Sequence, residues 1–219
     1  MEKFAVIVAG GSGSRMKRGI AKQFIELAGK PILMHTIEVF FNFDKTIQLV
    51  LVIPAGQIST WEKLCLAHNF TIAHQIAEGG STRFHSVKNG LGFIGDEGIV
   101  FIHDGVRPLV NQATLNACLE MAVEKGNAIP VLPVTESIRK GGNTNSVAAD
   151  RNDYFLVQTP QTFHCKLIKD AYCQDYRVQF TDDASVIEAF GESIHLVEGN
   201  RENIKITYPE DLEWAGCFL

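Results

Sequence analysis

Short runs of β-branched and other apolar residues alternate along this chain with segments whose apolar residues recur at helical spacing. This alternation is typical of a mostly parallel sheet with helices on both faces, because parallel strands need long crossover connections that are usually helices. The chain has 219 residues, so we expect a single domain spanning 1–219. The predicted strands are Phe4–Val8, Ile47–Ile53, Thr71–Gln75, Ile99–Ile102, Ala128–Val134, Phe155–Gln158 and His195–Val197, and the predicted helices are Ile32–Phe41, Ser59–Ala67, Arg83–Gly90, Thr114–Glu124, Lys166–Cys173, Asp183–Phe190 and Glu210–Trp214.

The stretch from 135 to 151 does not fit this layered pattern. It consists of two short, mostly polar runs on either side of Lys140-Gly141-Gly142-Asn143, a turn signal between strand-like arms. A hairpin of this composition has no apolar face to bury in the core of its own chain. We predict a hairpin that either lies on the surface or projects into another subunit, and the pattern alone leaves both possibilities open.

The charge balance excludes some classes of partner. The chain carries 20 Lys or Arg against 25 Asp or Glu, which gives a formal net charge of −5 and a pI near 5.8. A protein with this charge does not bind nucleic acid or an anionic membrane through its overall field, so neither partner is expected. The first 30 residues nevertheless contain six cations and two acids, so the amino end is locally positive.

The sequence also indicates where the protein works. No stretch has the roughly 18 consecutive apolar residues of a membrane-spanning helix. The opening run MEKFAVIVAGG lacks the length and cleavage pattern of a secretory signal. The five cysteines are widely spaced and never form Cys-x-x-Cys, which favours reduced thiols over a zinc site or a disulfide framework. We expect a cytoplasmic protein.

A glycine-rich loop, Ala9–Met16, follows the first predicted strand, and Lys22 comes shortly after it. Its glycines and serines let backbone N–H groups approach a phosphate, and Arg15 and Lys22 can neutralise the phosphate charge. The loop matches neither the dinucleotide-binding pattern Gly-x-Gly-x-x-Gly nor a P-loop, which requires Gly-Lys-Ser/Thr. The two cations suit a triphosphate, although a tight strand-to-helix turn with solvated cations is the alternative.

A second glycine-containing loop, Glu78–Arg83, precedes a predicted helix that carries Ser86 near its start. Small hydroxyl residues at this position usually cap the helix, so capping is favoured here over contact with a ligand.

The segment His103–Pro108 follows a predicted buried strand, and ligands bind at the carboxyl ends of strands in open α/β sheets. Asp104 could orient a ribose or help hold Mg²⁺, and Arg107 could bind a phosphate. The alternative is that Asp104 and Arg107 pair with each other at a turn. His103 is expected to be a packed, neutral histidine, because it adjoins the apolar run Val100–Ile102.

Near the carboxyl end, Lys205 lies between two isoleucines before Pro209. We predict a short strand here, with Lys205 either exposed to solvent or close to the phosphate-binding edge of the sheet.

Taken together, several segments resemble the 2-C-methyl-D-erythritol 4-phosphate cytidylyltransferases, a branch of the sugar nucleotidyltransferase family that serves the non-mevalonate isoprenoid pathway. The resemblance runs from about residue 3 to residue 215. The segments that carry it are Ala9–Met16, Lys22, Gly79–Ser86, His103–Pro108, Arg151–Gln161, Thr181–Ser185 and Asn203–Leu212.

The resemblance implies a Rossmann-like, three-layer αβα fold, CTP and Mg²⁺ as ligands, and a homodimer in which the arm at 135–151 reaches the neighbouring active site. It implies that the catalytic residues are Arg15, Lys22, Arg151 and Lys205. It implies CTP binding by Ala9, Gly10, Gly11, Gly13, Gly80, Ser81, Arg83, Ser86, Asp104 and Gly105, with Asp104 as a possible Mg²⁺ ligand. It implies binding of the sugar-alcohol phosphate by Arg107, Ser137, Arg151, Thr159 and Lys205.

Three positions depart from the family pattern. Ser137 stands where threonine is common, and Gly10 and Gly105 stand where alanine is common. These changes leave a ribitol-5-phosphate cytidylyltransferase as the alternative within the same reaction class. A non-catalytic nucleotide-binding regulator is the alternative from another class, although Arg15, Lys22 and Lys205 are all present.

Overall fold

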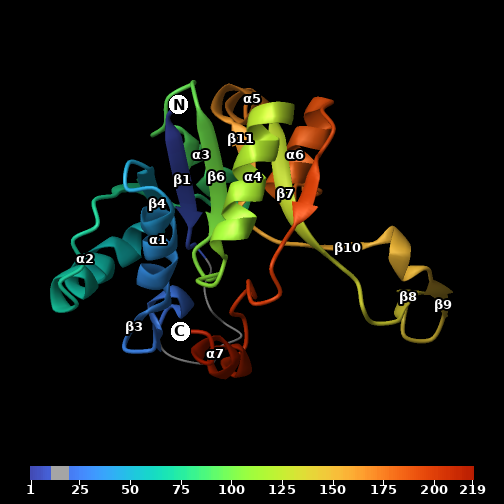
Figure 1. The fold of residues 1–219 in the computed structure, drawn as a ribbon, viewed down its shortest axis with the longest axis horizontal. Coiled ribbons are helices and arrows are strands. Elements are labelled where there is room, and N and C mark those ends of the chain that lie inside the picture. The colour runs from blue at the N-terminus through green and yellow to red at the C-terminus, as the bar shows by residue number, and fades with distance from the viewer. Residues whose placement is uncertain (11–19) are drawn as a thin grey trace.

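A computed structural model describes residues 1–10 and 20–219. Its central sheet has the strand order β10-β7-β11-β6-β1-β4-β5, and β12 pairs with β7 outside this path (Figure 1). Strands β1, β4, β5 and β6 are parallel to their neighbours in this group, whereas β11 is antiparallel to both β6 and β7. The predicted α/β fold with a mostly parallel sheet is therefore confirmed.

The described residues form the following elements, in chain order: β1 (Lys3–Val8), η2 (Lys22–Phe24), β2 (Glu26–Leu27), β3 (Lys30–Pro31), α1 (Ile32–Phe43), β4 (Gln48–Ile53), η3 (Ala55–Gln57), α2 (Ile58–Ala67), β5 (Gln75–Glu78), α3 (Arg83–Leu91), β6 (Ile99–Asp104), α4 (Gln112–Lys125), β7 (Asn127–Pro133), β8 (Ile138–Gly141), β9 (Ser146–Ala149), η4 (Arg151–Asp153), β10 (Phe155–Val157), β11 (Gln161–His164), α5 (Cys165–Ala171), α6 (Asp183–Phe190), β12 (Leu196–Glu198) and α7 (Pro209–Gly216).

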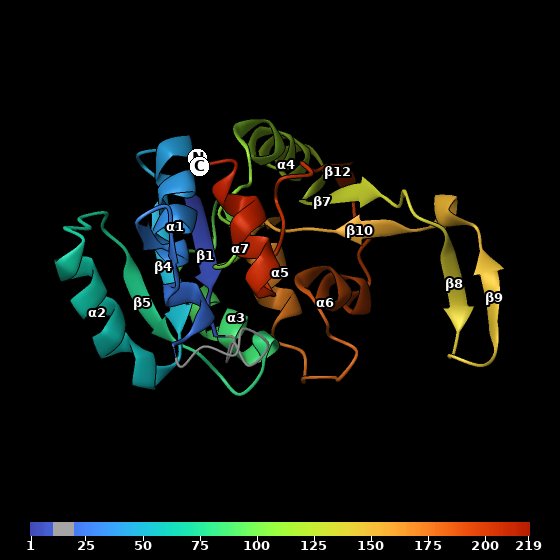
Figure 2. The same ribbon diagram turned by 90° about the horizontal axis from the view of Figure 1, so that it is seen from below.

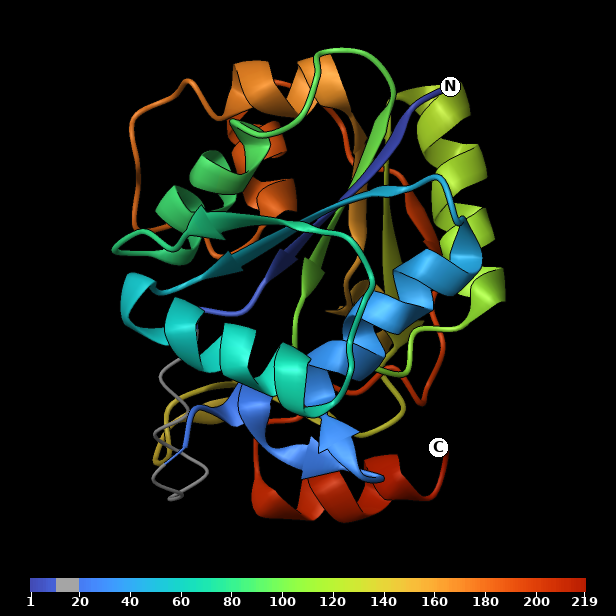
Figure 3. The same cartoon turned by 90° about the vertical axis from the view of Figure 1, so that its left-hand side faces the viewer.

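Helices cover both faces of the sheet. Figure 3 shows α1 and α4 over one face and α3, α5 and α6 over the other. Successive side chains of a strand point to opposite faces, so Ile99 and Phe101 of β6 join the core under α1 and α4, whereas Val100 and Ile102 join the core under α3 and α5. All six residues of β6 are buried, which explains why its sequence is a continuous apolar run ending in His103 and Asp104.

Two predicted strands were wrong, and strand β11 was missed. The strand expected at Thr71–Gln75 begins only at Gln75, because β5 pairs with β4 from Val50↔Gln75 onward and the β-branched run before it remains outside the sheet. Strand β11 was not predicted, since Gln161 and Thr162 gave it a polar start although both side chains are fully buried. Lys205 lies in an extended segment outside the strands.

The hairpin predicted within 135–151 is present as β8 and β9, which pair with each other in a sheet of their own. Figures 1 and 2 show the hairpin projecting well away from the body of the molecule. Gly141 has a φ of +126°, and a Cβ there would lie 2.2 Å from the carbonyl oxygen of Asn145, so the turn requires glycine. In the described part of the chain, no helix is both long and apolar enough to cross a membrane.

Candidate active site

A cavity of about 290 Å³ lies at the carboxyl ends of β1 and β6, which are at the lower end of the sheet in Figure 1. This is the edge at which open α/β sheets bind ligands. Nine residues predicted for the site come together here, namely Ala9, Gly10, Lys22, Gly80, Ser81, Arg83, Ser86, Asp104 and Lys205. Val8, Gln23, Thr82 and Val106 complete the described lining.

Lys22 begins the short helix η2 and is largely buried at the cavity, with 8% of its surface exposed. The next residue, Gln23, fixes this helix, because its Nε2 donates to the carbonyl oxygen of Ala9 at 2.8 Å and to Oε1 of Gln57 at 2.6 Å. Gln23 was missed by sequence reasoning, since a single glutamine beside a lysine matches no ligand-binding pattern. The first hydrogen bond ties the segment that carries Lys22 to the end of β1, and the second ties it to η3.

The second glycine loop is held by Ser86. The Ser86 hydroxyl accepts from the Gly80 N–H at 3.0 Å and donates to the carbonyl oxygen of Thr82 at 2.9 Å. A Cβ at Gly80 would lie 2.4 Å from Cβ of His85, so only glycine lets the loop fold this tightly over the helix start. The capping residue of α3 is Thr82, which accepts from the His85 N–H.

Asp104 contacts three cationic side chains. Its Oδ2 lies 2.9 Å from Lys205 Nζ and 3.3 Å from Arg107 Nε, and its Oδ1 lies 3.8 Å from Arg83 Nε. Burial alone would raise the pKa of this carboxyl, but the cations outweigh burial and hold the pKa well below its ordinary value. Asp104 is therefore ionised, and the Asp104–Arg107 pair considered from the sequence exists as part of a larger cluster.

The guanidinium of Arg83 is held by Asp183, the first residue of α6. Its Nη1 and Nη2 donate to the two carboxylate oxygens of Asp183 at 2.8 and 2.6 Å, and Tyr172 donates to the same carboxylate at 2.6 Å. Burial works against the charge on Arg83, but Asp183 and Asp104 outweigh it and raise the pKa of Arg83. Asp183 was also missed, because two adjacent acids are typical of a helix start, and here Asp182 caps α6 while Asp183 is its first residue.

His103 is fully buried and lies on the opposite face of β6 from Asp104, where its ring meets that of Phe40 at a centroid distance of 5.0 Å. Its Nε2 donates to the carbonyl oxygen of Arg107 at 2.9 Å, and its Nδ1 lies 3.1 Å from Oγ1 of Thr159. Burial lowers the pKa of His103 to about 4. The packed, neutral histidine expected from the sequence agrees with this geometry.

The buried imidazole makes stability depend on pH. In the unfolded chain His103 binds a proton near pH 6.5, whereas in the folded protein it does so only near pH 4, so falling pH favours the unfolded state across this window. Between pH 7 and 4.5 we expect the wild type to lose about 2 kcal/mol more unfolding free energy than His103→Gln, which cannot titrate. Urea unfolding at both pH values measures this difference, and equal losses would contradict it.

The remaining predicted residues lie beside or away from the cavity. Gly105 packs behind it, because a Cβ there would lie 2.9 Å from Cβ of Ala9. Thr159 is buried next to Asp104, whose N–H donates to Thr159 Oγ1 at 3.1 Å. Ser137 and Arg151 are exposed at the base of the projecting hairpin. The predicted residues Gly11, Gly13 and Arg15 lie outside the described residues.

The described lining of the cavity offers few ligands for a metal ion. Asp104 is the one acidic residue in the described lining, and across residues 1–10 and 20–219 no three His, Cys, Asp or Glu side chains form a metal-binding group. Mg²⁺ in phosphate-transfer sites is commonly bound by one or two carboxylates together with phosphate oxygens and water. The described residues are compatible with that arrangement and do not form a metal cage of their own.

A comparison with protein families shows the family to which the chain belongs. A sequence model of the 2-C-methyl-D-erythritol 4-phosphate cytidylyltransferases matches residues 4–219. The chain belongs to this cytidylyltransferase family. Curated members from Bacteroides fragilis and Phocaeicola vulgatus are 52% and 51% identical to it over 219 residues, and each alignment covers all of both chains.

Solved structures of cytidylyltransferase family members share the fold. The Francisella tularensis 2-C-methyl-D-erythritol 4-phosphate cytidylyltransferase is 29% identical to this chain and matches it with a TM-score of 0.84. The match covers 100% of both chains. The 2-C-methyl-D-erythritol 4-phosphate cytidylyltransferase from Thermus thermophilus is 28% identical to this chain, with a TM-score of 0.81. That match covers 100% of this chain and 98% of the Thermus thermophilus chain. The cavity at β1 and β6 is therefore the candidate active site of a nucleotidyltransferase.

Proposed function

We propose that this protein transfers the cytidylyl group of CTP to 2-C-methyl-D-erythritol 4-phosphate, forming 4-diphosphocytidyl-2-C-methyl-D-erythritol and pyrophosphate for non-mevalonate isoprenoid biosynthesis. The observation that carries the proposal is that Lys22 and Lys205, from opposite ends of the chain, line one cavity together with Gly80. A site for two phosphorylated substrates needs this local positive charge, although the whole chain is acidic.

The reaction needs alignment and charge stabilisation more than proton transfer. The second pKa of a phosphate monoester is near 6, so the substrate phosphate is mostly dianionic at pH 7 and needs no general base. One of its oxygens forms a bond to the α-phosphorus of CTP, while the bond from that phosphorus to the bridging oxygen breaks and its electron pair leaves with pyrophosphate. Lys22 and Arg15 stabilise the crowded α-phosphorus and the departing charge.

The acidic–basic cluster around Asp104 is the proposed binding site of the second substrate. In the structure Asp104 contacts Arg107 and Lys205, and these two cations are proposed to bind the sugar-alcohol phosphate. Thr159 is proposed to support this subsite from its place beside Asp104. Gly80, Ser81 and Ser86 line the cavity together with Ala9 and Gly10, and these residues are proposed to bind CTP. Mg²⁺ bound with the triphosphate, near Asp104, would supply further charge neutralisation at the phosphate oxygens.

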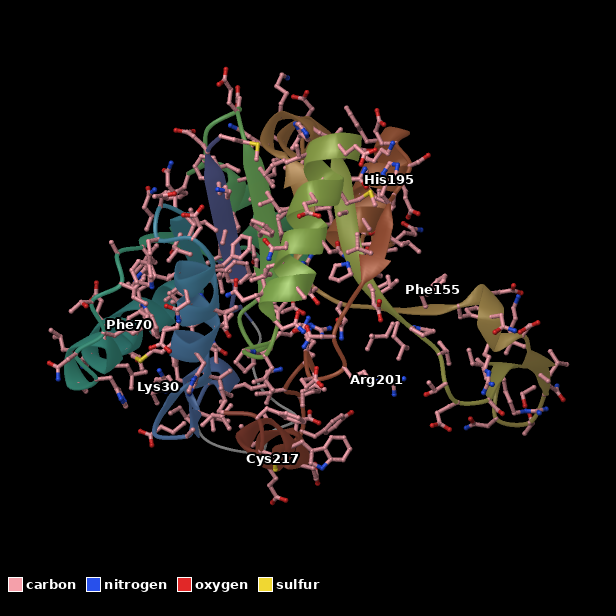
Figure 4. The ribbon with its side chains drawn as sticks, viewed as in Figure 1. Lys30, Phe70, Phe155, His195, Arg201 and Cys217 are labelled. Atoms are coloured by element: carbon pink, nitrogen blue, oxygen red, sulfur yellow. The ribbon has the colours of Figure 1, made fainter. Side chains whose placement is uncertain are left out.

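The projecting hairpin is proposed to form a homodimer and to complete the partner's site. Ser137 and Arg151 are not among the described residues that line their own chain's cavity. The chain joining the hairpin to the body exposes three consecutive apolar residues, Phe155, Leu156 and Val157, which are 43–56% exposed, and Figure 4 labels Phe155 on this connection. A contiguous exposed apolar segment of this kind marks an interface. An arm that leaves its own body can place Arg151 at a neighbouring site.

The choice of alcohol tests the proposal against the related ribitol-5-phosphate activity. With CTP and Mg²⁺ present, pyrophosphate release is measured with 2-C-methyl-D-erythritol 4-phosphate and with ribitol 5-phosphate, each over a range of concentrations. We expect kcat/KM to favour methylerythritol phosphate by at least ~10²-fold, the discrimination available to a site built to pair the hydroxyls of one alcohol. A preference for ribitol phosphate would assign the enzyme to the alternative activity.

A further inference from the structure

His103 is a buried titratable residue for which the proposed reaction has no chemical task. It is not among the described residues that line the cavity, and its side chain lies on the face of β6 covered by α1. Its neighbour Asp104 points to the opposite face, where it meets Lys205. His103 can therefore influence the site only through the main chain or through other residues.

The hydrogen-bond partners of His103 assign a role to each ring nitrogen. A carbonyl oxygen can only accept, so the 2.9 Å contact to the Arg107 carbonyl requires a proton on Nε2 of His103. In the neutral ring Nδ1 then accepts, and its partner at 3.1 Å is the Thr159 hydroxyl. That hydroxyl in turn accepts from the Asp104 N–H. The chain of bonds passes from Asp104 through Thr159 and His103 to Arg107.

This series of hydrogen bonds fixes both ends of the turn from Asp104 to Arg107. The Arg107 N–H donates to the Asp104 carbonyl at 3.1 Å, which closes the turn, and His103 holds the Arg107 carbonyl from behind. Arg107 Nη1 donates at 2.8 Å to the carbonyl of Asn203, two residues before Lys205. Asn203 Nδ2 donates to the Thr159 carbonyl oxygen at 2.8 Å. Hydrogen bonds thus join three separate segments, which carry Asp104, Thr159 and Lys205, in one largely buried ring.

We propose that His103 is a positioning residue, whose Nε2–H fixes the Arg107 main chain so that Arg107 and Lys205 are held at the sugar-alcohol phosphate subsite. The inference rests on the proposed function, because that function assigns the phosphate to these two cations. An error of about 1 Å in such a subsite costs up to ~10²-fold in rate, so a rigid hold on the turn matters. The CTP loop at Gly80 and Ser86 makes its own hydrogen bonds and does not depend on His103.

Two substitutions of similar shape separate positioning from packing. The amide of glutamine reaches the place of the histidine Nε2, whereas the shorter asparagine reaches only the place of Nδ1. His103→Gln can therefore keep the bond to the Arg107 carbonyl, and His103→Asn loses it while keeping the partner at Thr159. Phe40→Leu is the matched packing control, since it removes the ring against His103 without removing a hydrogen bond.

The experiment measures KM for each substrate separately, with kcat, in all three variants. We expect His103→Asn to raise KM for methylerythritol phosphate at least ~10-fold and to change KM for CTP less than ~2-fold. In His103→Gln both KM values should stay within ~3-fold of those of the wild type. Phe40→Leu should lower the free energy of unfolding without shifting either KM. Equal effects of Asn and Gln, or equal changes in both KM values, would overturn the positioning role.

Two further measurements keep this test separate from that of the proposed function. A wild type that shows no cytidylyl transfer refutes the function, and a normal KM for methylerythritol phosphate in Arg107→Ala refutes the subsite assignment on which the inference depends. If His103→Asn does not fold, ¹⁵N NMR of the wild-type ring decides, because the inference requires the proton on Nε2 at pH 7. A neutral ring with its proton on Nδ1 overturns it.

Discussion

Replacing Lys22 with alanine is expected to lower kcat by at least ~10²-fold, the scale of losing one transition-state donor. The side chain is 8% exposed and lines the cavity, and Gln23 fixes its helix to the end of β1. Steady-state kinetics with saturating CTP and methylerythritol phosphate measure the loss. Thermal unfolding of the same sample checks that the fold is intact.

Lys30→Ala is the matched control for this substitution. Lys30 lies on β3 and pairs with Glu38, and this partly exposed pair lies outside the described lining of the cavity, so its loss should leave kcat unchanged. Arg15→Ala is expected to give a loss similar to Lys22→Ala, on the strength of the sequence alone. Near-normal turnover in both Lys22→Ala and Arg15→Ala would contradict the assigned role of the amino-terminal cations.

Mixing two inactive variants is expected to restore activity if the arm serves the partner's site. In a heterodimer of Lys22→Ala and Arg151→Ala chains, the chain with intact Lys22 receives an intact Arg151 from its partner, so one of the two sites is complete. Random exchange between equal amounts should therefore recover about a quarter of wild-type turnover, since half of the dimers are mixed. Activity is followed after co-refolding or slow subunit exchange.

The control for this experiment is a mixture in which both chains carry Arg151→Ala, where no complete site can form. Differently tagged chains and native mass spectrometry establish that heterodimers are present. If heterodimers form and activity stays at the level of the separate variants, Arg151 does not act in trans. The hairpin would then be a surface feature, the other possibility that its sequence left open.

The predicted strands and helices were mostly confirmed where local pattern and tertiary packing agree. The apolar run that leads to Asp104 is the central strand β6, and a strand buried on both faces needs such a run. The helix expected at Asp183–Phe190 has those same bounds, because Asp182 caps its start and Gly191, with φ of +99°, ends it.

The parts that were not predicted depend on contacts between distant residues. In β11, Gln161 is fully buried because its side chain donates to Asp182 and accepts from the Ala184 N–H, and neither bond can be read from the residues around 161. The anchoring of Arg83 by Asp183 likewise joins two helix starts. The sequence pointed to the cationic and glycine-rich parts of the site, but not to the buried polar groups that hold them.

The most direct test of the central claim is pyrophosphate release by the purified protein with Mg²⁺, methylerythritol phosphate and each of CTP, UTP, ATP and GTP in turn. Fast release is predicted with CTP alone, and omission of methylerythritol phosphate should abolish it because the attacking group is the substrate's own phosphate. No release with CTP and methylerythritol phosphate, or equal release with another nucleotide, would contradict the account.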